Sequence, residues 1–373
     1  MARRTEVFGP AYLDRVLHVD RPLVESGPPL DQSVNGRWKF GEGLTLVDPE
    51  GREIALELPD DWPAPTGEVQ LARPLAIGPP GIRRTVRGLS WHDDLGGMGA
   101  GFAAAFGGEL ISALGPQDDP TSRAVADRLA RAGIRHRPIR VPDHPADWTL
   151  LVTSGACGDK LPIGFRGCHA AIGSILPDSY RPCDLRVVAA LPNRLAADAL
   201  RASGAAVRFF APAMRNMVDH DCPVSGFARA IDVLCCNRHE WERLADREEV
   251  ARRVSVLAVT DGPLGSTVRF TTPAGEAGSL RLGAFPRSDP PRDTNRAGEA
   301  YAATLLTVLL DCGWTPGVTD ESLARLAAES ASIAAALVLD RLDFGFPTPA
   351  EIVAARRAGR VEGPDGGTGD DLR

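Results

Sequence analysis

Apolar and polar residues alternate along this chain with two different periods, and the two periods predict where strands and helices lie. Short, mostly apolar runs bounded by turn residues indicate buried strands at residues 109–115, 148–153, 186–191, 207–210, 232–236 and 254–259. Longer segments with apolar residues at helical spacing occupy residues 121–132, 194–203 and 323–342. This alternation is typical of an α/β fold with a mainly parallel sheet and helices on both faces. In such a sheet, ligands bind at the carboxyl ends of the strands.

Residues 21–90 interrupt this alternation, because prolines and glycines become frequent and the apolar runs become short. Residues 45–47 and 54–58 flank the turn sequence Asp48-Pro49-Glu50-Gly51, which predicts a β-hairpin. The segment therefore predicts a β insertion, long enough to carry extra elements or a homodimer contact. At the other end, residues 356–373 are rich in glycine and acidic residues, which predicts a disordered tail.

The composition narrows the class of protein. Hydrophobic residues make up 43% of the 373 residues, which is ample for a core. The net charge of -7 argues against nucleic acid or an anionic membrane as partner, because no concentrated basic face is present. No run of about eighteen apolar residues predicts a membrane span, and the basic start leads into no sustained apolar region. The seven cysteines lack Cys-x-x-Cys spacing, so reduced thiols in a cytoplasmic protein are expected and a zinc site is not.

The segment 293–301 carries the strongest candidate chemistry. Its Asp-Thr-Asn start offers helix caps, small residues follow, and residues 302–310 form an apolar run of helical length. A helix start collects unpaired backbone N–H groups and partial positive charge, which suits it to hold a phosphoryl group. Glu299, one turn inside, could take a proton from an attacking hydroxyl. The alternative is an ordinary capped helix.

A glycine-rich segment at residues 96–101 precedes another helical pattern, and glycines let the backbone approach a ligand closely. A dinucleotide fingerprint starting at Gly97 would need its last glycine where Phe102 stands, so an NAD-linked enzyme is disfavoured. The chain also lacks the Gly-x-x-x-x-Gly-Lys-Ser/Thr pattern, which excludes a P-loop as the route to nucleotide chemistry.

Several segments together resemble the ribokinase-like (PfkB) family of carbohydrate and nucleoside kinases, over residues 5–355. The family's closing signature reads Asp-Thr-x-Gly-Ala-Gly-Asp, and Asp293, Thr294, Ala297 and Gly298 fit it. Two positions depart from the pattern. Arg296 replaces the first glycine, and Glu299 replaces the catalytic aspartate.

Further motifs follow in family order. Asn237-x-x-Glu240 is similar to the element that arranges magnesium, and a carboxylate such as Glu240 suits a hydrated magnesium ion. The loop from Thr260 to Gly265 is similar to the nucleotide loop, and Asp14 stands where an aspartate hydrogen-bonds sugar hydroxyls, although a surface aspartate in a turn is equally compatible with that segment. The resemblance implies nucleotide contacts at Asn237, Thr260, Asp261, Gly262 and Gly265, and acceptor contacts at Asp14, Gly96, Gly97 and Gly101. Gly101 stands where the family has an asparagine that touches the sugar.

The resemblance implies one ribokinase-like domain over residues 1–355, a three-layer sandwich in which residues 21–90 form an enlarged β lid. It implies an ATP- and Mg²⁺-dependent kinase that phosphorylates a hydroxymethyl group of a small sugar or nucleoside-like substrate. Glu299 would act as base, and the amides of Ala297 and Gly298 would hold the γ-phosphate. Arg296 would either add a cation beside the phosphate or occlude the site. The alternative is a ribokinase-like ligand-binding or regulatory protein that does not turn its ligand over.

Overall fold

The computed structural model describes residues 3–20, 37–40, 44–47, 53–61, 84–154, 159–174, 180–287, 296–341 and 344–359. Within these ranges a large sheet has the strand order β16-β15-β14-β13-β12-β11-β1-β7-β8. Its strands are β1 (Thr5–Phe8), β7 (Glu109–Leu114), β8 (Arg135–Arg140), β11 (Cys183–Ala189), β12 (Ala205–Ala211), β13 (Val233–Asn237), β14 (Val256–Thr260), β15 (Ser266–Thr271) and β16 (Ala277–Leu282). All pairings are parallel except those of β15 and β16, which confirms the mainly parallel sheet.

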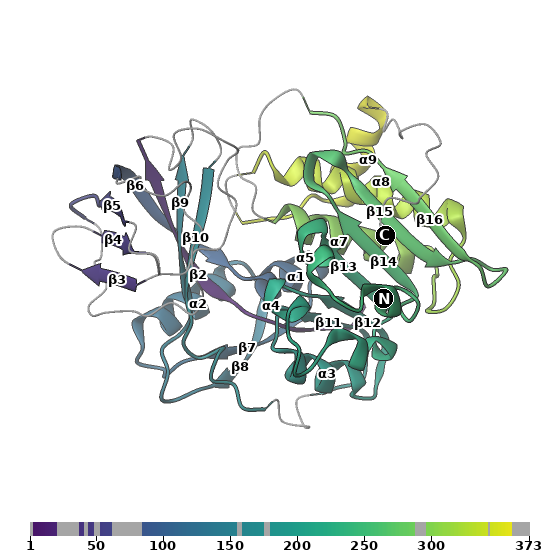
Figure 1. Ribbon diagram of the computed structural model, residues 1–373, viewed down its shortest axis with the longest axis horizontal. Helices are drawn as coiled ribbons and strands as arrows, with labels where there is room; N and C mark the ends of the chain where they lie inside the picture. The colour runs from purple at the N-terminus through teal and green to yellow at the C-terminus, as the bar shows by residue number, and fades with distance from the viewer. Residues whose placement is uncertain are drawn as a thin grey trace.

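Helices cover both faces of the large sheet (Figure 1). They are α1 (Met98–Phe106), α2 (Pro120–Arg131), α3 (Asn193–Arg201), α4 (Met214–Met217), α5 (Arg238–Arg243), α6 (Arg247–Ala251), α7 (Ala297–Asp311), α8 (Glu321–Val338) and α9 (Pro349–Ala358), with short 3-10 turns at Val224–Gly226, Ala228–Ala230 and Gly262–Leu264. Strands β1, β7 and β8 advance across the sheet in one direction and β11 to β14 in the other. Because parallel crossovers are right-handed, α1 and α2 lie on one face and α3, α5 and α6 on the other. Helix α7 contacts α1 and α8, so these helices share a layer.

A smaller sheet stands beside the large one, at the left in Figure 1. We call it the small sheet; it has the order β10-β9-β2-β6-β5-β4-β3 among the described residues. Its strands are β2 (Tyr12–Val19), β3 (Arg37–Phe40), β4 (Leu44–Val47), β5 (Glu53–Glu57), β6 (Arg84–Gly96), β9 (Trp148–Ser154) and β10 (Asp159–Phe165). The hairpin expected within residues 45–58 is confirmed by the antiparallel pairing of β4 with β5. The strand predicted at residues 148–153 also belongs to this sheet, where it pairs with β2.

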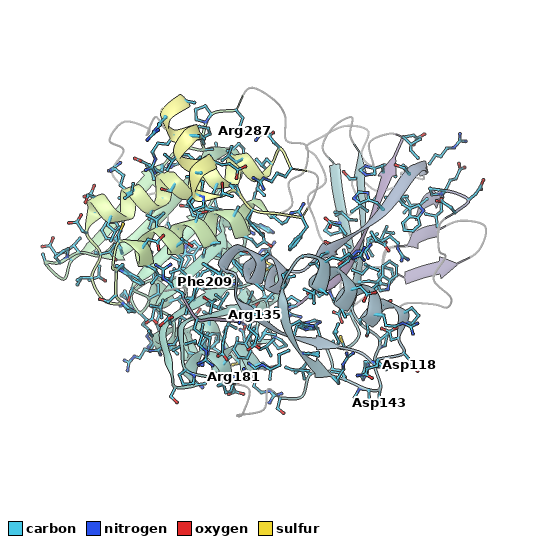
Figure 2. All side chains as sticks on the ribbon, turned by 180° about the vertical axis from the view of Figure 1, so that it is seen from behind. Asp118, Arg135, Asp143, Arg181, Phe209 and Arg287 are labelled. Atoms are coloured by element: carbon cyan, nitrogen blue, oxygen red, sulfur yellow. The ribbon has the colours of Figure 1, made fainter. Side chains whose placement is uncertain are left out.

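The core between the large sheet and α1 is aromatic and tightly packed. Phe209 of β12 is labelled in Figure 2. Its ring meets that of Phe102 of α1 edge-on, with ring centroids 5.3 Å apart. Both side chains are almost fully buried, and they belong to one apolar cluster that spans strands and helices of both layers. Within the described ranges no helix is long and apolar enough to cross a membrane.

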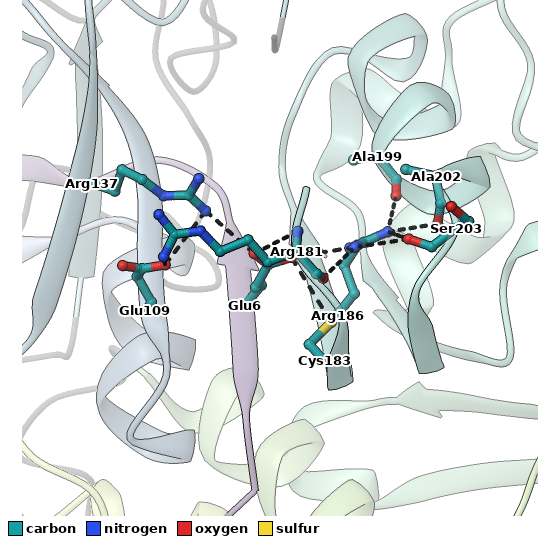
Figure 3. Close-up of polar contacts among 9 residues, drawn as sticks. All are labelled: Glu6, Glu109, Arg137, Arg181, Cys183, Arg186, Ala199, Ala202 and Ser203. Atoms are coloured by element: carbon teal, nitrogen blue, oxygen red, sulfur yellow. Dashed lines mark hydrogen bonds and ion pairs between the residues drawn. The ribbon is translucent and has the colours of Figure 1, made fainter. Parts of the chain in front are cut away.

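A buried ion pair ties the first strand to its neighbour β11 (Figure 3). Glu6 and Arg186 are register partners, 1% and 0% exposed, and Arg186 Nη2 lies 3.3 Å from Glu6 Oε2. Arg186 Nη1 also donates to the carbonyl oxygens of Ala199 and Ala202 at the end of α3. Because each charge has a partner, the desolvation cost of burial is offset, and the network fixes α3 against the sheet.

Candidate active site

The strand order of the large sheet reverses between β1 and β11, and ligands of such sheets bind in the crevice at this point. Here Gly9 follows β1 and packs directly on Gly99 of α1, since a Cβ on Gly9 would lie 2.9 Å from the Gly99 Cα. Gly97 has φ 95°, and a Cβ there would lie 2.5 Å from the Pro10 carbonyl oxygen. The glycines at residues 97 and 99 therefore allow close packing of backbone on backbone, which brings the start of α1 to the carboxyl edge of the sheet.

The tip of α7 reaches the same edge. The N-cap Arg296 makes no side-chain cap hydrogen bond, and Gly298 is exposed. Among the described residues, nothing lies within 4 Å of the position that a Cβ on Gly298 would take. The first backbone N–H groups of a helix lack intrahelical partners, so the open tip can receive an anion. The expected caps Asp293 and Thr294 lie outside the described residues.

Glu299 lies one turn inside α7 and faces α1. Its Cγ lies 3.4 Å from the position that a Cβ on Gly101 would take, and a ring carbon of Phe346 lies 3.5 Å from that position. The missing side chain of Gly101 therefore leaves the space that Glu299 and Phe346 border. The structure thus brings together Glu299, the expected base, and Gly101, an expected acceptor-binding residue.

Arg296 immediately precedes α7 in the left-handed conformation, with φ 67°. Its side chain is 9% exposed, and Nη1 lies 3.4 Å from Asp94 Oδ2 of β6. The guanidinium also lies over the ring of Phe344, 5.4 Å from its centroid. Arg296 thus points toward the small sheet and the segment at residues 344–346.

Asn237 and Glu240 form a capping box at the start of α5. The Glu240 N–H donates to Asn237 Oδ1 at 2.8 Å, and the Asn237 N–H donates to Glu240 Oε2 at 3.0 Å. Burial raises the pKa of Glu240 to about 7, and the negative charge of Glu299 adds to the rise. The two carboxylates are therefore close enough to repel each other, and a divalent cation held by Glu240 would relieve that repulsion.

The loop after β14 lies beside this capping box, because Thr260 and Asn237 are register partners at the ends of parallel strands. The Asp261 N–H donates to the Gly265 carbonyl at 2.7 Å, which closes the loop, and Asp261 Oδ2 pairs with Arg238 at 2.7 Å. Gly262 is exposed with φ 52°, and Gly265 has φ 94°. The five expected nucleotide residues therefore gather at one edge.

The expected acceptor residue Asp14 lies on β2 of the small sheet, opposite Asp94. A side chain on Gly96 would collide with the Asp14 carboxylate, so Gly96 makes room for it. Asp14 and Asp94 share one face of the sheet, and Asp94 pairs with Arg296. Asp14 therefore belongs to the same side of the molecule as the tip of α7.

No family model matches this chain, and no curated protein matches it in sequence. Solved structures do match. A nucleoside kinase of Methanocaldococcus jannaschii, described as an archaeal member of the ribokinase family, superposes with a TM-score of 0.63 at 15% identity over 95% of this chain and 98% of its own. Ribokinase of Thermotoga maritima gives 0.62 at 16% over 95% and 99%. Ribokinase of Arabidopsis thaliana, in complex with ribose and ATP, gives 0.62 at 16% over 95% and 99%.

The fold is ribokinase-like. At these identities the likeness is one of architecture, and it confirms the expected α/β sandwich with a smaller second sheet. It carries no residue-level assignment, so the site residues above stay predictions.

The structure adds residues to this candidate site that the motifs did not indicate. Asp94, Phe344 and Phe346 contact Arg296 or border Glu299 and Gly101. Tyr301 ties α7 to β15, because its buried hydroxyl donates to Ser266 Oγ at 2.8 Å. Asp94 lies two residues before Gly96, and this position beside the glycine-rich segment is the feature of the sequence that could have indicated Asp94 as a site residue. The contacts of Phe344 and Phe346 join residues distant in the chain, so no local sequence pattern predicts them.

A second cluster of chemically capable side chains lies at the root of the β9–β10 hairpin. Asp147, Cys168 and His169 are buried, with possible ligand atoms within 4.8 Å of one another. Asp147 Oδ1 accepts from the N–H groups of Gly167 and His169 at 3.0 and 3.1 Å. These are the contacts of a carboxylate that closes a turn, and they hold the end of β10 against the start of β9.

Proposed function

We propose that this protein is an ATP-dependent kinase that transfers the γ-phosphoryl group to a hydroxymethyl group of a small sugar or nucleoside-like compound. The observation that carries the proposal is the position of Glu299. It stands in the first turn of α7, borders Gly101 of α1, and lies close enough to Glu240 to raise the pKa of that group. The ribokinase-like fold and the neighbours that bind ribose, inosine and ATP support the same chemistry.

In this proposal Glu299 accepts the proton of the acceptor hydroxyl while the amides of Ala297 and Gly298 bind the oxygens of the transferred group. Phosphoryl transfer depends mainly on positioning and on stabilising charge, so an open helix tip beside a carboxylate supplies what the step requires. Glutamate is one methylene longer than aspartate, and the space left by Gly101 accommodates the added length. Asp14, from the small sheet, would orient the acceptor through its hydroxyl groups.

The opposite side of the site would hold the nucleotide. Asn237, Thr260 and the loop to Gly265 lie together at the ends of β13 and β14, and a nucleotide would bind at an edge of this kind. Magnesium bound with ATP would neutralise phosphate charge, and Glu240 is the residue that would hold it, directly or through water. Its pKa near 7 fits this role, because a cation would favour the ionised form that burial and Glu299 disfavour. The cysteines within the described ranges are free thiols, which supports a cytoplasmic location.

The test is ATP turnover against a panel of sugars, sugar derivatives and nucleosides, with the variant Glu299→Gln beside the wild type. Gln keeps the size of the side chain but cannot accept the proton, so turnover on an active acceptor is expected to fall by roughly 10²–10⁴-fold. Glu276→Gln, in the exposed turn between β15 and β16, is the matched control and should leave turnover unchanged. Equal turnover of the Glu299 variant and the wild type would remove Glu299 as base. Ligand binding without any turnover would instead identify a binding protein.

A further inference from the structure

An ion pair joins the small sheet to the tip of α7. Asp94 and Arg296 are 202 residues apart in the chain, yet Arg296 Nη1 lies 3.4 Å from Asp94 Oδ2. Their side chains are 27% and 9% exposed, so solvent screens this pair less than a surface pair. The ring of Phe344 lies against the same guanidinium and restricts it further.

The two ends of this pair lie beside the two halves of the site. Asp94 lies near the end of β6 and is the register partner of Asp14 on β2. After Asp94 the chain continues through Gly96 and Gly97 into α1. Arg296 directly precedes the first turn of α7, which carries Glu299. A movement of β6 away from α7 would therefore separate Asp14 from Glu299, and the ion pair opposes that movement.

The backbone of Arg296 indicates that its side-chain contacts matter. Its φ of 67° lies in the left-handed region, which is unfavourable for a residue with a side chain. Such a conformation persists only where the surroundings over-determine it. The pairing with Asp94 and the contact with Phe344 provide that constraint at the point where the chain enters α7.

The neighbouring residue Asp93 offers an internal comparison. Successive residues of a strand point to opposite faces, so Asp93 faces away from α7. It pairs with Arg15 at 3.0 Å and with Arg128 of α2 at 3.9 Å. Ion pairs thus hold strand β6 on both of its faces at adjacent positions, and the face that carries Asp94 is the one toward the candidate site.

We propose that Asp94 and Arg296 are a positioning pair that fixes the root of the small sheet against the tip of α7, so that the acceptor held by the sheet meets Glu299 at transfer distance. The role in transfer rests on the proposed kinase function; the mechanical coupling does not. Arg296 acts here through Asp94 as a brace between two elements. Neither residue is assigned a contact with the transferred phosphoryl group.

The test is a double-mutant cycle in the full-length chain with Asp94→Asn, Arg296→Gln and the double variant. Glutamine leaves a side chain on the left-handed residue, so the cycle measures the ion pair and leaves the backbone strain in place. Hydrogen exchange of β6 is measured without ligand. Each single variant is expected to accelerate exchange at residues 88–95 by roughly three- to thirty-fold, and the double variant no more than the larger single effect. Asp93→Asn is the control, and its effect should multiply with that of Arg296→Gln.

Kinetics give the second measurement on any acceptor that the panel identifies. Each single variant should raise the KM for the acceptor and lower kcat, while the KM for ATP stays within about twofold, because the pair braces the acceptor side. Arg296→Lys keeps the charge and should retain part of the exchange protection. Multiplying effects of Asp94→Asn and Arg296→Gln in hydrogen exchange would overturn the proposal. If no acceptor is phosphorylated, the proposed kinase function fails. The double-mutant cycle in hydrogen exchange still tests whether Asp94 and Arg296 are coupled.

Discussion

The proposed nucleotide side and the proposed acceptor side of the candidate site are built by different means. On the nucleotide side, the capping box of Asn237 and Glu240 and the closed loop from Asp261 to Gly265 are local structures, each made within about four residues. On the acceptor side, the contacts join residues far apart in the chain, as in Asp94 with Arg296. Local backbone structures need particular residue types, whereas distant side-chain contacts can be rebuilt by paired substitutions.

This difference accounts for where the chain departs from the motifs it resembles. Asn237, Glu240, Thr260 and Gly265 keep the expected types, while Gly101 and Glu299 both depart and border the same space. A longer carboxylate on α7 fits beside a residue without a side chain on α1. We therefore expect the acceptor side to tolerate change in matched pairs and the nucleotide side to tolerate little.

The largest effect is expected at Gly265. A Cβ there would collide with the Leu282 carbonyl oxygen, and φ 94° strains any other residue. Gly265→Ala should lower the free energy of unfolding by about 3 kcal/mol or more and weaken nucleotide binding, because the backbone of the loop must shift. Thermal unfolding and calorimetric titration with ATP measure the two effects.

Gly262→Ala is the matched control in the same loop. Gly262 also has a positive φ, 52°, but nothing in the described part of the chain lies within 4 Å of its Cβ position. The cost should be about 1 kcal/mol, from the left-handed backbone alone. Similar stability losses in both variants would show that the close contact at Gly265 does not matter.

The next effect concerns the matched pair on the acceptor side. Gly101→Asn should crowd Glu299, and Glu299→Asp should shorten its reach, so each single variant is expected to lose roughly 10–100-fold in kcat/KM. The double variant should recover part of that loss, since the shorter acid leaves space for the asparagine. Steady-state kinetics of the four proteins give the coupling. A double variant that loses the product of the two single losses would show that the positions are independent.

The sequence predicted many of the strands and helices because those patterns are local, and it placed Asn237, Glu240 and the loop from Thr260 to Gly265 at the ends of neighbouring strands. Alternation along residues 232–236 and 254–259 marked β13 and β14, and the residues after them gave the motifs. The membership of residues 148–153 in the small sheet was not predictable, since an apolar run does not specify its partner strand. The pairing of Arg296 with Asp94 was also beyond the motif, because it depends on how β6 approaches α7.

A smaller effect follows from the ionisation of Glu240. Its pKa of about 7 in the folded protein lies above the 4.5 expected for the unfolded chain, so the folded state binds an additional proton between these pH values. The stabilisation is complete below pH 4.5, is lost as the pH rises through this window, and changes no further above about pH 7. The loss should be on the order of 1–2 kcal/mol, after allowance for partial exposure.

Urea unfolding of the wild type and of Glu240→Gln across pH 4.5–8 measures this slope. The variant should lack the Glu240 contribution, and Glu299→Gln should shift it to lower pH, because the repelling charge is removed. Identical pH profiles for the wild type and Glu240→Gln would contradict the raised pKa.

The smallest effect is expected from Arg296→Gly, which restores the glycine that the motif has at this position. Glycine relieves the left-handed strain but loses the ion pair to Asp94 and gives the unfolded chain more freedom. The stability should therefore stay within about 1 kcal/mol of the wild type and exceed that of Arg296→Gln, which loses the pair and keeps the strain. Urea unfolding of the three proteins compares them directly. If Arg296→Gln proves the more stable variant, the strain at residue 296 is negligible, and the ion pair is no longer needed to explain the left-handed backbone.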